Sequence, residues 1–373
     1  MSLTREKLIR AALRTVPGIG SQRLRHLIAL FGSAQLAWEA SAAEYAAWAD
    51  SPWLQRVSLE REKIDLAWLE NDLNQRGISL LIPEEEIYPL LLAELSDAPP
   101  LLYYRGRISV GAKGLAMVGS RQATAYGKAA ADKLAREAAQ HGLVVISGLA
   151  RGIDTAAHQG ALAAGGETWA FLGCGVDLIY PPENQRLAQQ IMANGAVLSE
   201  FIPGTTPEPN HFPARNRLIS GCAAGVVVVE AGLKSGAMIT VDFALDQGRE
   251  VFAVPGPIFS EMSRGTHHLL RSGAKLVEEL ADIIAEIPAW DEVQLPKMSS
   301  KRIEPEGRNR IEAFIPHEAE ILALLSDVPL HIDQVALQCS LIPEEVPLAL
   351  LELQLAGKIE QLPGQRYVLA RRS

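Results

Sequence analysis

The chain has 373 residues, which is long for a single hydrophobic core and predicts two or three domains. Its hydrophobic content of 48% and charged content of 21% are ordinary for a globular protein, and its net charge of −9 argues against a surface that coats nucleic acid indiscriminately, while leaving room for a local basic groove. The three cysteines are far apart and lack CxxC spacing, which argues against a disulfide framework or a zinc site and favours a reducing cytosol.

The N-terminal residues 1–75 read as a helical domain. They begin without the apolar run of a secretory signal, and no later window is apolar enough for a transmembrane helix, so we expect a cytoplasmic protein without membrane contact. Within residues 3–33, Pro-Gly-Ile-Gly at 17–20 separates two amphipathic runs, as in a helix–hairpin–helix. Residues 1–33 hold six Lys/Arg and one Asp/Glu, a balance of +5, so this hairpin is either a DNA-phosphate contact or a helical packing unit. Four tryptophans are expected to fill the core of this domain: Trp38, Trp48, Trp53 and Trp68.

Residues 76–287 read as an α/β domain that begins with a proline-rich approach segment. Short apolar runs alternate with amphipathic helices, and this alternation predicts right-handed crossovers and a Rossmann-like, mostly parallel sheet. The expected strands are 115–119, 143–147, 168–172, 196–200, 226–230, 250–254 and 274–277. The expected helices include 125–140, 184–193 and 237–247.

Four strand-to-helix turns in this domain combine small residues with Arg or Lys. They are MVGSRQATAYG (117–127), VVISGLARGID (144–154), HFPARNRLISG (211–221) and VVVVEAGLKSGAMIT (226–240). A helix N-terminus offers free backbone N–H groups, glycine admits a phosphate closely, and a nearby cation adds attraction. Because parallel strands end at one edge of their sheet, these turns predict a site for an extended anion with several phosphates.

Each turn supplies candidate ligands for such an anion. The expected contacts are Gly119, Ser120, Arg121, Gly148, Arg151, Phe212, Arg215, Asn216, Arg217, Lys234, Ser235 and Gly236. Arginine can bind phosphate bidentately or stack on a base, and Phe212 either stacks on a base or anchors the turn. Asp154 is expected to cap the next helix or orient Arg151, and Glu230 to orient an arginine or accept a base N–H. His158 reads as a core histidine, and no metal or other cofactor is expected.

The C-terminal segment reads as a linker followed by a small domain. Residues 288–314 are rich in proline and charge and have no sustained period, which is typical of a linker. Residues 315–373 read as three helices and a hairpin, the outline of a winged helix. This segment holds four Lys/Arg against eight Asp/Glu, a balance of −4, whereas winged helices that grip DNA are usually basic. We therefore expect a protein-contact or regulatory module here.

Nine segments in order resemble the DNA-processing protein A family, also called Smf. They are PPLLYYRG, VGSR…YG, SGLARGID…HQGAL, GCGVDLIYPPEN, SEFIPG, FPARNRLISG, EAGLKSGAMIT, AVPG and RGTHHLLRSGAKLV. His267 stands where the family usually has Asn, and Cys222-Ala223-Ala224 replaces its usual Leu-Ser. The resemblance implies sequence-independent binding of single-stranded DNA during DNA uptake and recombination. It also implies loading of the RecA recombinase and a homodimer formed through the Rossmann-like domain.

Enzymatic readings match the sequence less well. The chain lacks GxGxxG at its first turn, the P-loop GxxxxGK[ST] and a GxSxG elbow, so no catalytic residue is expected. The main alternative is a nucleotide phosphoribohydrolase of the lysine-decarboxylase-like family. Members of that family carry a motif similar to PGGxGTxxE at the fifth strand. Here the equivalent turn is EAGLKSGAMIT, without the Gly-Gly pair or the later Glu. A second alternative is a structural adaptor that binds no oligonucleotide.

Overall fold

The computed structural model describes residues 3–47, 51–290, 318–326, 328–339, 341, 345–362 and 364–370. Contacts between residues divide the chain into two compact units, residues 1–296 and 297–373. Most of the expected linker, and Trp48, lie outside the described residues. No helix within the described ranges is long and apolar enough to span a membrane.

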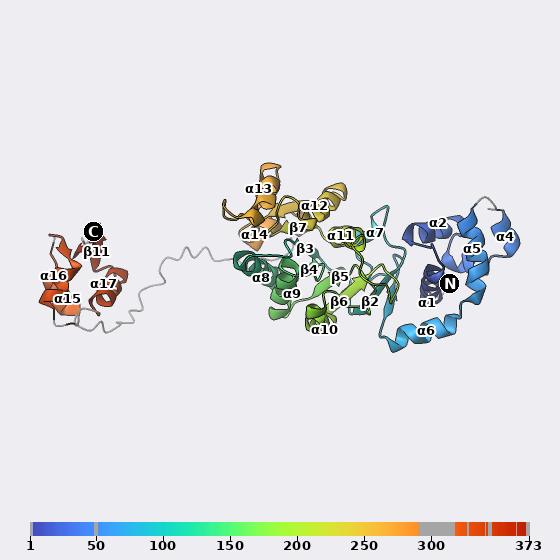
Figure 1. The fold of residues 1–373 in the computed structure, drawn as a ribbon, viewed down its shortest axis with the longest axis horizontal. Coiled ribbons are helices and arrows are strands. Elements are labelled where there is room, and N and C mark those ends of the chain that lie inside the picture. Colours follow the sequence, from blue (N-terminus) through green and yellow to red (C-terminus); the bar gives the residue numbers. More distant parts are fainter. Residues whose placement is uncertain are drawn as a thin grey trace. The chain divides into compact units, whose positions relative to one another are not determined.

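The first unit begins with a bundle of short helices (Figure 1). They are α1 (Leu3–Thr15), α2 (Ser21–Phe31), α3 (Ala34–Glu39), α4 (Ala42–Ala46), α5 (Pro52–Glu60) and α6 (Leu66–Gln75). Leucine, isoleucine and valine side chains from α1, α2 and α5 form its core, against which Trp38 and Trp53 pack. Trp68 is 63% exposed, so the expectation that all four tryptophans are core residues is wrong for Trp68.

The bundle is followed by a nine-stranded sheet. Its strands are β1 (Ser79–Leu81), β2 (Leu102–Gly106), β3 (Gly114–Val118), β4 (Val144–Ser147), β5 (Thr168–Phe171), β6 (Gly195–Ser199), β7 (Gly225–Val228), β8 (Glu250–Ala253) and β9 (Lys275–Leu276). The order across the sheet is β1-β2-β6-β5-β4-β3-β7-β8-β9. Strands β3 to β9 pair in parallel, and β1 and β2 join antiparallel at one edge. The expected mostly parallel Rossmann-like core is confirmed.

Helices cover both faces of this sheet, as the alternation of buried side chains along β3 requires. Leu115 and Met117 join a core cluster with α8 (Ala125–Gln140) and α9 (Ile153–Ala163). Ala116 and Val118 join the opposite cluster. That second cluster packs under α11 (His211–Gly221) and α12 (Gly236–Asp246), which Figure 1 shows on the other side of the strands. Among the described residues of this unit, the remaining α-helices are α7 (Leu90–Ala93), α10 (Gln185–Asn194), α13 (Arg264–Arg271) and α14 (Leu280–Ile284).

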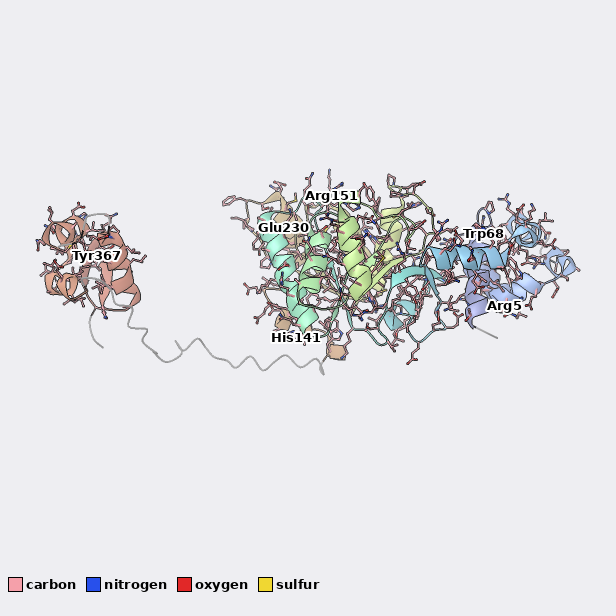
Figure 2. All side chains as sticks on the ribbon, turned by 90° about the horizontal axis from the view of Figure 1, so that it is seen from below. Arg5, Trp68, His141, Arg151, Glu230 and Tyr367 are labelled. Carbon is pink, nitrogen blue, oxygen red and sulfur yellow. The ribbon has the colours of Figure 1, made fainter. Side chains whose placement is uncertain are left out.

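The strand order reverses direction between β3 and β7, because β4, β5 and β6 continue to one side and β8 and β9 to the other. In open parallel sheets this switch point leaves a crevice at the carboxyl ends of the two central strands, where ligands bind. Figure 2 shows Arg151 and Glu230 at that edge of the unit, and His141, which follows α8 ahead of β4, at the opposite edge. The fold therefore brings the turns that were predicted to bind an anion to one edge of the sheet.

The second unit has its own core. Its elements are α15 (Glu318–Leu324), β10 (Leu330–His331), α16 (Ile332–Gln338), α17 (Val346–Leu355), β11 (Ile359–Leu362) and β12 (Arg366–Leu369). The strands form a small sheet in the order β10-β12-β11. Ile321, Val335, Leu350 and Tyr367 pack together between the helices and this sheet. The expected winged-helix outline is confirmed.

Candidate nucleic-acid interface

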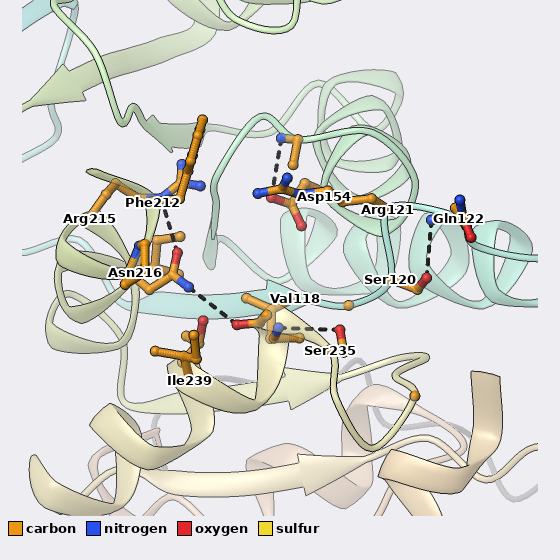
Figure 3. A pocket seen from close by; sticks show the side chains of 18 of the residues that line it. Val118, Ser120, Arg121, Gln122, Asp154, Phe212, Arg215, Asn216, Ser235 and Ile239 are labelled. Carbon is orange, nitrogen blue, oxygen red and sulfur yellow. Dashed lines mark hydrogen bonds between the residues drawn. The ribbon is translucent and has the colours of Figure 1, made fainter. Parts of the chain in front are cut away.

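A pocket of about 760 Å³ opens at the switch point (Figure 3). The turn after β3, the loop before α9 and the first turns of α11 and α12 form its walls. The polar residues that line it are Ser120, Arg121, Gln122, Asp154, Tyr180, Arg215, Asn216, Lys234, Ser235 and Thr240. Sequence reasoning missed Gln122, Tyr180 and Met262 as parts of this wall. The Ser120 hydroxyl lies 3.2 Å from the Met262 sulfur. These two residues are 142 positions apart in the sequence, so no local pattern predicts their contact.

The turn after β3 holds Arg121 at the pocket. The Ser120 N–H donates to the Glu230 carbonyl at 2.6 Å, and the Ser120 hydroxyl accepts the Gln122 N–H at 3.1 Å. A Cβ on Gly119 would lie 2.7 Å from the Glu230 carbonyl oxygen, so this close strand-to-strand approach requires glycine. Arg121 is exposed, and its guanidinium carbon lies 5.1 Å from the centroid of the Phe212 ring. A cation and an aromatic face therefore stand together at the mouth of the pocket.

Arg215 lines the same pocket but is 4% exposed. Its Nη1 donates to the carbonyl oxygens of Gly148, at 2.6 Å, and Phe171, and its Nε donates to Asn216 Oδ1 at 3.2 Å. Burial lowers the pKa of Arg215 to about 10, although Asp154 opposes the shift, so the side chain stays charged at neutral pH. These donors tie α11 to the ends of β4 and β5, which gives Arg215 a structural role, and its expected contact with phosphate stays a prediction.

Asp154 fixes the loop after β4. Its carboxylate is 7% exposed and accepts the N–H groups of Gly148, at 3.1 Å, and Ala150, at 3.2 Å. Burial raises the pKa of the Asp154 carboxyl, and Arg215 and these N–H groups oppose that shift. Asp154 therefore neither caps α9 through its side chain nor orients Arg151. It holds the loop in the shape that Arg215 needs.

Two of the expected cations, Arg151 and Arg217, do not point into the main pocket. Arg151 forms an ion pair with Glu183 and does not line the main pocket. Arg217 lies 2.5 Å from Glu200 and 3.3 Å from Asp97, and its side chain is 14% exposed. Arg217 therefore anchors α11 to the approach segment.

The first turn of α12 closes the pocket on the side opposite Arg121. Ser235 caps this helix by accepting the Ala237 N–H at 3.3 Å. A Cβ on Gly236 would meet nothing within 4 Å, so open space lies before the helix N-terminus. Asn216 donates to the Gly236 carbonyl at 3.4 Å, and Lys234 is exposed at the rim. Within the described residues neither Lys234 nor Arg121 has a carboxylate at ion-pair distance.

Glu230 is 2% exposed and acts on α8 rather than on an arginine. Its carboxylate accepts the N–H of Thr124 at 2.8 Å and the hydroxyl of Thr124 at 2.6 Å. Thr124 in turn caps α8 by accepting the Gly127 N–H at 3.1 Å. The expectation that Glu230 orients an arginine is therefore wrong, because both of its oxygens hold the first turn of α8.

His158 is fully buried, and its Nδ1 lies 2.7 Å from the Thr168 hydroxyl. Burial lowers the pKa of His158 to about 3, so the ring is neutral at physiological pH. Its expected position in the core is confirmed. In the part of the chain that the structure describes, no group of three His, Cys, Asp or Glu side chains could hold a metal ion.

The cations of the basic hairpin (residues 1–33) contact other groups of the same protein. Arg10 is 3% exposed and pairs with Glu6 at 2.8 Å and with Glu84. Arg14 donates to the carbonyls of Ile19 and Glu200, each at 3.0 Å. The other four are also engaged: Lys7 with Glu85, Arg5 with Glu39, Arg23 with the Gly18 carbonyl and Arg25 with the Ser96 carbonyl. These contacts favour the packing interpretation of the hairpin over a DNA contact.

Known proteins share this architecture. Residues 79–288 match the family described as DNA recombination-mediator protein A, and residues 314–365 match the DprA winged helix domain. The chain is 32% identical to Protein Smf of Synechocystis over 94% of this chain and 96% of that protein. It is 46% identical to DNA processing protein DprA of Streptococcus pneumoniae over 54% of this chain and 72% of that protein.

Two solved structures are similar. The X-ray structure of DprA from Streptococcus pneumoniae has a TM-score of 0.66 and 36% identity, over 77% of this chain and 99% of that one. A structure of DNA processing protein A from Helicobacter pylori, reported for its single-stranded DNA binding mode, has a TM-score of 0.50 and 33% identity, over 56% of this chain and 94% of that one. The shared fold, family matches and identities together show that the chain belongs to the DNA processing protein A (DprA/Smf) family.

Proposed function

We propose that this protein binds single-stranded DNA, without sequence preference, in the pocket at the sheet's switch point. The observation that carries the proposal is the pair Arg121 and Lys234, two exposed cations without carboxylate partners in the described residues, on opposite sides of one pocket. Neutralised phosphates release condensed counterions, which favours binding at two such cations. Phe212 beside Arg121 offers a face on which an unpaired base can stack.

The form of the pocket favours unpaired DNA over duplex. An unpaired strand is flexible enough to enter a pocket of about 760 Å³ and to turn its bases toward the wall, whereas a duplex is stiff and broad. The Helicobacter pylori relative, reported for its single-stranded DNA binding mode, supports the same substrate. Base-edge readout is not needed for either contact, because phosphates and stacked rings are common to all sequences.

The biological role proposed is delivery of this strand to the RecA recombinase during DNA uptake and recombination. The description of the matching family as a recombination mediator supports this role, as do the DNA-processing names of the relatives. The protein would act as a homodimer through its Rossmann-like domain and without chemistry of its own. Incubation with nucleoside monophosphates should release no free base, which distinguishes the proposal from a phosphoribohydrolase.

Binding is tested by fluorescence anisotropy with labelled single-stranded and duplex oligonucleotides of equal length. We expect a much higher affinity for the single strand than for the duplex. We also expect R121A to lower the affinity for the single strand. The matched control is R107A, because Arg107 is exposed and follows β2 beside the start of β6, at the opposite edge of the sheet. Equal affinities for single strand and duplex, or equal losses in R121A and R107A, would overturn the pocket assignment.

Delivery is tested by the rate at which RecA assembles on DNA already covered by a single-stranded DNA-binding protein. Wild-type protein and R107A should shorten the lag before assembly, and R121A should not. Tight DNA binding with an unchanged lag would leave the pocket assignment standing and remove the mediator role.

A further inference from the structure

A second groove lies beside the main pocket, between α8, α9 and the short helix η2 (Pro182–Asn184). Its volume is about 510 Å³. The polar side chains that line it include Lys128, Asp132, Arg151, Thr155, Gln159 and Glu183. The main anion-binding pocket contains none of these residues. The groove is therefore a separate polar site on the same unit.

The charges in this groove are not equally available. Asp132 is held by Arg136 through two hydrogen bonds of 2.6 and 3.1 Å. Glu183 is held by Arg151. Lys128 is exposed, and within the described residues no carboxylate lies at ion-pair distance from it. With both carboxylates already paired, the groove presents an uncompensated positive charge, which is the property an anion site needs.

A third, small hollow connects the linings of the groove and the main pocket. A small hollow is lined by Arg121, Ala150, Tyr180, Phe212 and Arg215, which belong to the main pocket as well, and by Arg151, which belongs to the groove. Arg151 thus stands where the two spaces meet.

We propose that this groove is a second phosphate subsite for the same DNA strand, with Lys128 and Arg151 as its cations and Glu183 as the partner of Arg151 when DNA is absent. The side chains of Arg151 and Glu183 are 53% and 50% exposed, and exposed ion pairs contribute little to stability. Exchange of the carboxylate for a phosphate therefore costs little. This inference rests on the proposed function, because it assigns a further part of the same strand's path.

The test compares two labelled oligothymidylates, of about 6 and about 20 nucleotides. These lengths are chosen because a single-strand site of this kind covers only a few nucleotides. The short strand fills the main pocket, and the long strand reaches the groove as well. For K128A we expect unchanged binding of the short strand and about a 5-fold weaker binding of the long one in 0.1 M salt, as one lost phosphate contact implies. The slope of log affinity against log salt for the long strand should fall by about 0.7.

The matched control is K133A, which removes the same charge from the same helix. Lys133 is 58% exposed, lies 3.6 Å from Glu137, donates to the Glu278 carbonyl and does not line the groove. If K128A and K133A affect the long strand equally, the subsite is wrong while the main pocket stands. If neither oligonucleotide binds the wild-type protein, the proposed function itself fails, and the subsite fails with it.

A second variant tests the exchange at Arg151. E183Q removes the carboxylate that competes with phosphate while keeping the size of the side chain. We expect it to bind the long strand more tightly than wild type by roughly the factor that K128A loses, with no change for the short strand. Unchanged or weaker binding of the long strand by E183Q would show that Arg151 does not pass from Glu183 to DNA.

Discussion

The guanidinium of Arg215 lies in the space that a side chain on Gly148 would occupy. A Cβ on Gly148 would be 2.5 Å from both Nη atoms of Arg215, and Nη1 donates to the carbonyl of Gly148 itself at 2.6 Å. Because the carbonyl of Phe171 also accepts from Nη1, Arg215 cannot swing aside without losing both bonds. Helix α11 is therefore joined to the ends of β4 and β5 at the floor of the pocket.

This relationship predicts a difference between two glycine substitutions. G148A should displace Arg215 and lower the free energy of unfolding by about 1–3 kcal/mol, the usual range for overpacking and for a buried donor left unpaired. G236A, in open space at the first turn of α12, should leave stability within about 1 kcal/mol of wild type. Urea unfolding of both variants measures the difference, and equal stabilities would contradict the close packing described for Arg215.

Arg121 and Arg215 should respond differently to removal. R215A leaves two carbonyls unpaired and Asp154 buried without its compensating charge, so we expect a loss of about 2–4 kcal/mol of stability. R121A removes an exposed side chain and should change stability by less than about 0.5 kcal/mol. Thermal and urea unfolding, measured before any binding assay, check both. A stable R215A that had lost DNA binding would show that Arg215 also binds phosphate.

The buried His158 should make stability depend on pH. Its pKa falls from 6.5 to about 3 on folding, so the unfolded chain binds a proton that the folded one does not. The stability from neutral His158 is fully present above pH 6.5 and is lost as the pH falls toward 3. Between these two pH values the free energy of unfolding falls by up to about 1.4 kcal/mol for each pH unit of acidification. Urea unfolding at several pH values should give a shallower dependence for H158Q, and parallel curves would contradict this assignment.

The acidic second unit should contribute little to binding of short DNA. Residues 297–373 form a compact unit with its own core, so a chain that ends near residue 296 should fold. We expect its affinity for a short single strand to stay within a few-fold of the full chain. A loss above ~100-fold, or about 2.7 kcal/mol, would make the winged helix a DNA-binding module and the charge argument wrong.

Local sequence patterns predicted most of the secondary structure of the first unit. The expected helix 125–140 matches α8 at both ends, because Thr124 caps it and strand-length apolar runs flank it on both sides. The expected strands lie within two residues of β3 to β9 at each end. The parallel pairing of the strands followed from the alternation of strands and helices, and it correctly placed the turns after β3 and β7 at one edge.

The roles of individual arginines did not follow from the sequence. Arg121 and Arg215 both stand in small-residue turns near a helix start, yet Arg121 is exposed and Arg215 is buried. The difference arises from carbonyl groups 67 and 44 residues away in the chain, at Gly148 and Phe171. Glu230 was misassigned for the same reason, since its partner Thr124 is 106 residues distant. Such long-range pairings depend on the folded sheet and leave no local signature.

The salt dependence of single-strand affinity for the double variant R121A/K234A, with R107A as control, tests the account most directly. Each phosphate contact on a single strand contributes about 0.7 to the slope of log affinity against log salt. The double variant, with an unchanged unfolding midpoint, should bind a short oligonucleotide more weakly and with a slope lower by about 1.4, while R107A keeps the wild-type slope. A folded double variant with wild-type affinity and slope would show that the strand does not lie in this pocket.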